Sequence, residues 1–160
     1  MEDRLQEFAT DIATYGWIVM KVSANTPPDP DFAYSIGLFQ SYSHPEIILV
    51  GLPIEIAHQI INDVGAAIRE GKRYVAGGTS DEFLERYNVT FRTVPEYQYG
   101  AYLGWGRRYY RSHHFPVLQL VYPDRMGRWP WHEEVSPQFR AAQPVLADEP
   151  EPPWAREPAV

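Results

Sequence analysis

Cysteine is absent from the 160-residue chain, which excludes disulfide bonds and thiolate metal sites and is typical of proteins from a reducing compartment. No apolar run approaches the roughly 20 residues that span a bilayer. Residues 1–7 are polar and acidic, unlike the start of a signal peptide. Together these features predict a cytoplasmic protein with no membrane segment.

Positive charge is also scarce. The chain has 14 lysine and arginine residues against 21 aspartate and glutamate residues, a formal net charge of −7. An acidic chain disfavours nonspecific binding to a phosphate backbone, so duplex nucleic acid is not expected as a partner. A small molecule or another protein remains open as the partner, and the composition indicates neither a cofactor nor an oligomeric state.

Aromatic residues are plentiful, at 14% of the chain with 11 tyrosines and 5 tryptophans, which indicates either an aromatic core or a stacking surface. The length predicts one globular domain, here assigned to residues 1–147. Residues 148–160 are acidic and rich in proline and are expected to form a disordered tail.

Hydrophobic periodicity predicts an α+β fold, in which three or four helices pack on a mixed or antiparallel sheet of about five strands. The continuously apolar segment 47–50 indicates a central strand covered on both faces, and the strand at 115–122 is placed next to it. Residues 25–30 are expected to form a loop, and residues 79–82 resemble a capping box that opens a turn. The predicted helices span 2–15, 53–70, 96–110 and a short segment after 136, and the predicted strands span 17–22, 32–38, 46–52, 89–94 and 115–122.

Several short motifs in fixed order carry a resemblance to a known family. They are Tyr-Gly-Trp at 15–17, Phe-Ala-Tyr-Ser-Ile-Gly-Leu at 32–38, His-Pro-Glu at 44–46 with Gly-Leu at 51–52, and Leu-Gln-Leu-Val-Tyr-Pro-Asp at 118–124 followed by Gly127, Pro130 and Trp131. From about residue 15 to residue 146 the chain resembles the bacterial family named domain of unknown function 4262. The resemblance implies a small bacterial domain and implies no reaction.

Polar residues near the ends of the second and third predicted strands form the first candidate site. Tyr34, Ser35, His44 and Glu46 bring together hydroxyl groups, an imidazole and a carboxylate, which can serve as nucleophile, base and orienting group. The structural alternative is favoured, because the chain has no Gly-x-Ser-x-Gly elbow and His44 could simply bond to backbone groups of a loop.

A second candidate site follows the strand at 115–122. Asp124 and Gln119, beside Trp129 and Trp131, could orient and stack a small ligand. The alternative is a turn in which Asp124 accepts hydrogen bonds from its own backbone while the indoles close the core.

The first set of residues lies near the strands at 32–38 and 46–52, and the second follows the strand at 115–122. If these strands lie side by side with their polar ends together, both sets of residues line one recess. The sequence then predicts a ligand-binding or interaction domain with a His/Asp/Trp-lined pocket at strand ends. The alternative is a hydrolase or transferase acting on a nucleotide-like molecule, with Arg107 and Arg108 as an anion clamp. The aromatic residues around those arginines equally fit a helix that buries its rings and exposes its charges.

No metal site is predicted. His44, Glu46, His113, His114, Asp124 and His132 are the residues that could supply ligands. The chain has no His-Glu-x-x-His pattern. Neighbours such as His113 and His114 point to opposite sides of an extended chain, so at most one of them would reach a given site.

Overall fold

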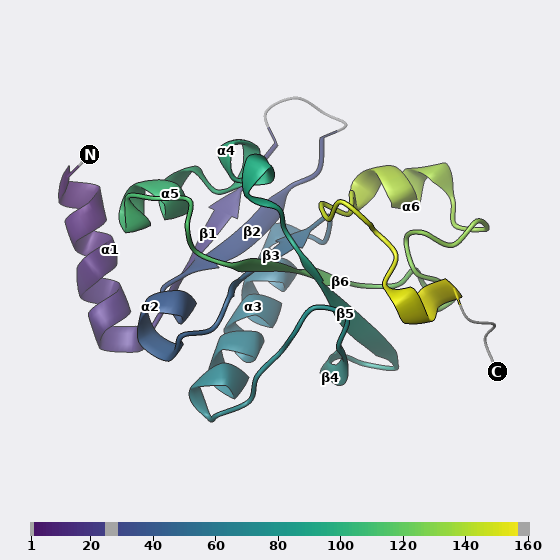
Figure 1. Cartoon of the computed structure of the whole chain (residues 1–160), viewed down its shortest axis with the longest axis horizontal. Coiled ribbons are helices and arrows are strands. Elements are labelled where there is room, and N and C mark those ends of the chain that lie inside the picture. Colours follow the sequence, from purple (N-terminus) through teal and green to yellow (C-terminus); the bar gives the residue numbers. More distant parts are fainter. Residues whose placement is uncertain (1, 25–28, 157–160) are drawn as a thin grey trace.

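The computed structural model of the chain describes residues 2–24 and 29–156. Helices cover both faces of one mixed sheet (Figure 1). The α-helices are α1 (Glu2–Tyr15), α2 (Leu38–Tyr42), α3 (Ile54–Arg69), α4 (Tyr99–Tyr102), α5 (Gly104–Tyr110) and α6 (Pro137–Ala142), and the 3-10 helices are η1 (Glu96–Gln98) and η2 (Pro153–Arg156). The strands are β1 (Ile18–Val22), β2 (Phe32–Ile36), β3 (Glu46–Val50), β4 (Thr79–Leu84), β5 (Tyr87–Thr93) and β6 (Val117–Val121).

The sheet has six strands in the order β1-β2-β3-β6-β5-β4. All neighbouring strands are antiparallel except the central pair, in which β3 and β6 run parallel with Glu46 opposite Val117. The starts of β3 and β6 therefore lie at the same end of the sheet, together with the ends of β2 and β5. The α+β prediction is confirmed, as is the place of the 115–122 strand beside the central one.

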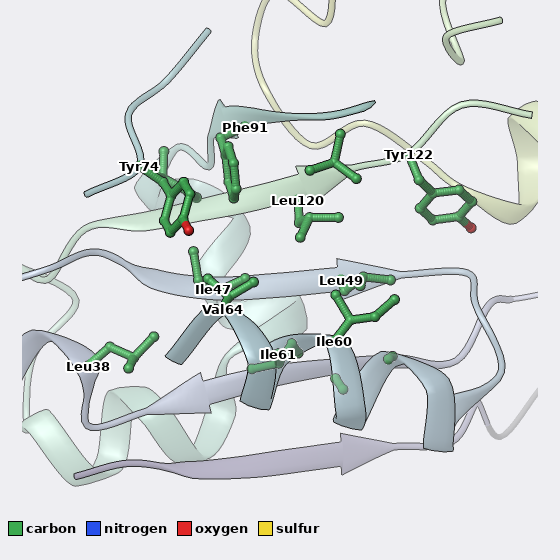
Figure 2. Packing of buried hydrophobic residues seen from close by; sticks show 14 of the residues in the cluster. Leu38, Ile47, Leu49, Ile60, Ile61, Val64, Tyr74, Phe91, Leu120 and Tyr122 are labelled. Atoms are coloured by element: carbon green, nitrogen blue, oxygen red, sulfur yellow. The ribbon is translucent and has the colours of Figure 1, made fainter. Parts of the chain in front are cut away.

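The central strand is buried on both faces because its alternate side chains enter two separate cores. Ile47 and Leu49 join the core beneath α3, whereas Ile48 and Val50 join the core covered by α1, α4 and α5. Figure 2 shows the first of these cores, where Ile60, Ile61 and Val64 of α3 lie against the sheet. Burial on two sides accounts for an uninterrupted apolar run in place of an alternating one.

Strand β4 was not predicted. Its residues form an antiparallel hairpin with β5, with Leu84 opposite Tyr87. The reversal passes through Arg86 at a φ of 73°, a left-handed conformation that usually selects Gly or Asn. The turn therefore lacks its usual sequence signal, and the local bonds between Ser80 and Glu82 resemble a helix cap.

Two other elements differ from the expectation. Strand β2 ends at Ile36, and Gly37 at a φ of 120° turns the chain into the short helix α2, where the prediction continued the strand. The predicted helix 96–110 is divided into η1, α4 and α5, with Leu103 in a non-helical conformation between the last two.

The segment predicted to be a disordered tail contacts the body of the domain over its described part. The Arg92 guanidinium donates to the carbonyl of Glu149, and the Trp154 indole N–H donates to the carbonyl of Gly77 at 2.9 Å. Trp154 also lies edge-on to Trp129. Most of the predicted loop 25–30 lies outside the described residues. Residues 157–160 of the predicted tail also lie outside them. None of the described helices combines the length and apolar character needed to cross a membrane.

Candidate functional site

The Glu46 carboxylate is the centre of a buried hydrogen-bond network at the start of β3. The side chain is 1% exposed. Its two oxygens accept from three successive backbone N–H groups, those of residues 37–39, at 2.9, 3.1 and 3.2 Å. The hydroxyls of Ser35 and Tyr110 also donate to it. Burial raises the pKa of Glu46, and the hydrogen bonds oppose that rise.

This network fixes the end of β2, the first turn of α2 and the end of α5 around one carboxylate. The N–H groups at the start of a helix have no partner within the helix, and here the carboxylate of a neighbouring strand supplies the acceptor. Ser35 is not accessible as a nucleophile because it is 1% exposed. Its Oγ donates to Glu46 at 2.7 Å and accepts from the N–H of Ile47 at 2.9 Å. The hydroxyl of Tyr34, which is 2% exposed, accepts from the N–H of Trp105.

His44 is fully buried and bonded to backbone on both ring nitrogens. Its Nε2 lies 3.0 Å from the N–H of Tyr74 and its Nδ1 lies 2.9 Å from the carbonyl of Pro45. These partners define a neutral ring that donates from Nδ1 and accepts at Nε2. Burial lowers the pKa of His44. The imidazole therefore joins the loop before β3 to the segment before β4 and does not face solvent.

Asp124 lies beyond the end of β6 and organises a turn. Its Oδ1 accepts from the backbone N–H groups of Met126 and Arg128, both at 2.9 Å, and its Oδ2 accepts from Arg128 Nε at 3.0 Å. Burial alone would raise the pKa of Asp124, but the hydrogen bonds from Arg128 and Met126 lower it on balance. Trp129 and Trp131 stack with ring centroids 5.6 Å apart and are half-buried beside this turn.

Gln119 is fully buried on β6. Its amide donates to the carbonyl of Pro144 at 2.9 Å and accepts from the N–H of Leu146 at 2.8 Å. Gln143 forms a similar pair with both backbone groups of Tyr122. These two side-chain amides attach the segment after α6 to β6 and the residue that follows it.

The two candidate sets do not converge. His44 precedes β3, whereas Asp124 follows β6. Because these two strands run parallel, the two residues lie at opposite ends of the sheet. A five-residue strand is about 16 Å long. The shared recess that the sequence suggested for His44 and Asp124 therefore does not exist, and the buried residues of each set bond to the protein itself.

A cleft of about 650 Å³ opens at the end of the sheet where β3 and β6 begin. It lies between the segment before β4 (73–76), the junction of β5 with η1 (93–96) and the segment leading into β6 (114–118). Its walls are largely apolar, with Tyr99 and Phe115 among them. The Arg73 guanidinium at its edge already donates to the carbonyls of Tyr42 and Ser43.

The predicted anion-binding residues lie in a second hollow on the same part of the surface. Arg107, Arg108 and Arg111 line this hollow of about 500 Å³ at the end of α5. Arg108 lies over the ring of Trp105 at 4.8 Å, a cation–π contact. Within the described part of the chain, none of these three arginines forms an ion pair. The three charges together favour an anion at this hollow.

Comparison with known families places most of the chain within a family model. The family model described as a domain of unknown function, DUF4262, matches residues 11–136. The chain belongs to the DUF4262 family. This match confirms the family resemblance of the sequence motifs. No curated protein and no solved structure matches the chain, so the comparisons attach no reaction to it.

In this DUF4262 chain, the motifs that carry the resemblance have structural tasks. Ser35, Gly37 and Glu46 hold the β2–α2 corner, and Gln119 anchors the segment after α6. Sequence reasoning missed Tyr110 as the partner of Glu46, because the two residues are 64 positions apart. The cleft was not predicted either, because the apolar residues of its walls cannot be distinguished from core residues in the sequence.

Proposed function

We propose that this DUF4262 domain binds a small molecule that has an apolar body and a negatively charged group. The single observation that carries the proposal is the cleft of about 650 Å³ beside the arginine-lined hollow. Ligand sites are commonly concave, mostly apolar and of about 300–1,000 Å³, with a few polar groups that orient the ligand. The apolar walls would hold the body of the ligand, and the arginines would hold its charge.

Histidine residues connect the two depressions. His114 lines the cleft, the neighbouring His113 lines the arginine hollow, and their ring centroids are 4.4 Å apart. One ligand can therefore contact both depressions across this pair. Ser35, His44 and Glu46 are each buried and bonded to the protein itself. Their burial favours a binding role for the domain over a catalytic one.

The proposal is tested with anilinonaphthalene sulfonate, an aromatic dye that carries one sulfonate and fluoresces on entering an apolar site. The native protein is expected to bind about one dye molecule. Val75→Asp, which puts a carboxylate on an exposed cleft residue, and Arg107→Gln, which removes a charge from the hollow, should each weaken binding about tenfold.

Matched control variants are available at the other end of the molecule. Met126→Asp replaces another exposed apolar residue and Arg125→Gln another exposed arginine, and neither lines the cleft or the hollow. Near-ultraviolet circular dichroism must remain native, because this dye also binds partly unfolded states. The proposal fails if the native protein does not bind the dye, or if the control variants weaken binding as much as the cleft and hollow variants do.

A further inference from the structure

Three metal-ligating side chains meet on the surface between the cleft and the arginine hollow. Glu96 lies in η1, and His113 and His114 lie in the connection between α5 and β6. Glu96 Oε1 is 3.5 Å from His114 Nδ1, and Glu96 Oε2 is 3.8 Å from His113 Nε2. One ligand atom from each of the three residues can be chosen so that all lie within 4.8 Å of one another.

The local backbone brings both imidazoles to the same side. Arg111 ends α5 in a left-handed conformation at a φ of 55°, and the N–H of His114 donates to Ser112 Oγ at 2.9 Å. The chain therefore bends through residues 111–115 and is not extended there. Neighbouring histidines point apart only in an extended chain, so the prediction that at most one of them reaches a given site is wrong at this place.

The spacing of the three groups suits a metal ion. Ligand atoms bound at 2.0–2.2 Å to a tetrahedral ion lie roughly 3.3–3.6 Å from one another. The two distances from Glu96 are close to that range, and all three side chains are more than half exposed, so rotation about side-chain bonds can close the remainder. Two imidazoles and one carboxylate are a donor set that binds Zn²⁺ and other divalent first-row metals and leaves coordination positions open.

We propose that Glu96, His113 and His114 bind a divalent transition-metal ion at the rim shared by the cleft and the arginine hollow. The alternative is that the histidines only form ion pairs with Glu96 when they are protonated. The metal site stands on these three side chains, so it does not require that the cleft hold a ligand. Were both proposals correct, the ion would be placed to contact a bound molecule where its apolar and charged parts join.

The test is isothermal titration of the metal-free protein with Zn²⁺ alone, accompanied by visible spectroscopy with Co²⁺. We expect one Zn²⁺ per chain with a dissociation constant below about 10 µM. The Co²⁺ complex should show absorption bands of a low-coordinate nitrogen and oxygen site. His113→Ala/His114→Ala and Glu96→Gln should each weaken Zn²⁺ binding by roughly tenfold or more, since even the loss of a group that only supports a ligand has an effect of that size.

His58→Ala is the matched control. His58 is also partly exposed and lies 3.9 Å from a carboxylate, that of Glu55, but this pair lacks a second imidazole. Its replacement should leave Zn²⁺ binding unchanged. Absence of saturable binding to the native protein, or binding that survives in the double histidine variant, would overturn the metal site. Dye binding measured on the same proteins reports on the cleft separately, so failure of one proposal is distinguishable from failure of the other.

Discussion

Replacement of Glu46 by glutamine tests whether this carboxylate holds the β2–α2 corner together. The change keeps the size of the side chain but converts one carboxylate oxygen to an NH₂ group. Glu46 accepts five hydrogen bonds and three of the donors are backbone N–H groups, which cannot reverse their role. Whichever way the amide is placed, its NH₂ group faces at least one of those N–H groups.

The magnitude follows from the number of donors that lose their acceptor. Oε1 accepts from the N–H of Leu38 and Oε2 from the N–H groups of Gly37 and Phe39, so one or two buried donors are left unpaired. Each unpaired donor costs about 1–3 kcal/mol. Glu46→Gln should therefore lower the free energy of unfolding by about 2–4 kcal/mol, which corresponds to a decrease in Tm of roughly 5–15 °C for a domain of this size.

Urea unfolding followed by circular dichroism measures this change, and amide hydrogen exchange localises it. The N–H groups of Gly37, Leu38 and Phe39 should lose protection more than those of the central strands. Glu55→Gln, at an exposed carboxylate on α3, serves as the control and should alter stability by less than about 0.5 kcal/mol. If Glu46→Gln is as well tolerated as this control, the buried network does not stabilise the fold in the way described.

Two further predictions concern the same end of the sheet. Burial lowers the pKa of His44 below its ordinary value of 6.5, so its contribution to stability is present above that pH and is lost as the pH falls through the pKa of the folded state. Urea unfolding of the native protein between pH 7.5 and pH 5 should show this loss, and a slope that persists unchanged in His44→Gln would refute it. Gly37→Ala should cost about 2–4 kcal/mol, because φ is 120° and the added Cβ would lie 2.7 Å from the carbonyl oxygen of Gly16. Gly77→Ala, with a positive φ but open space, should cost clearly less when both variants are compared by urea unfolding, and equal losses would contradict the steric explanation.

The sequence contains enough information to predict the core elements of this fold. Helices α1 and α3 have long amphipathic patterns, and the short apolar segments at β3 and β6 favour buried central strands. Strand β4 and helix α2 escaped prediction because neither has the usual sequence signal for a hairpin turn or for a helix start. Arg86 adopts a left-handed turn without a glycine, and α2 begins where Glu46 supplies its acceptors.

The candidate site was less predictable because it depends on strand direction. Polar residues near the ends of two apolar strands meet only if those ends lie at the same edge, and no local pattern shows whether β3 and β6 run parallel. With parallel strands, Asp124 is carried away from His44. The sequence does place His113 and His114 beside each other, but only the bend after Arg111 turns both rings toward Glu96.

The single parallel pairing of β3 with β6 divides the sheet into two halves that are each continuous in the chain. Strands β1 to β3 form one antiparallel unit and strands β4 to β6 another, so each unit can assemble from contacts between successive segments. Joining them closes a loop of about 70 residues, which is the larger entropic step. Long-range pairings slow folding, so we expect the β3–β6 pairing to form after the contacts within each half.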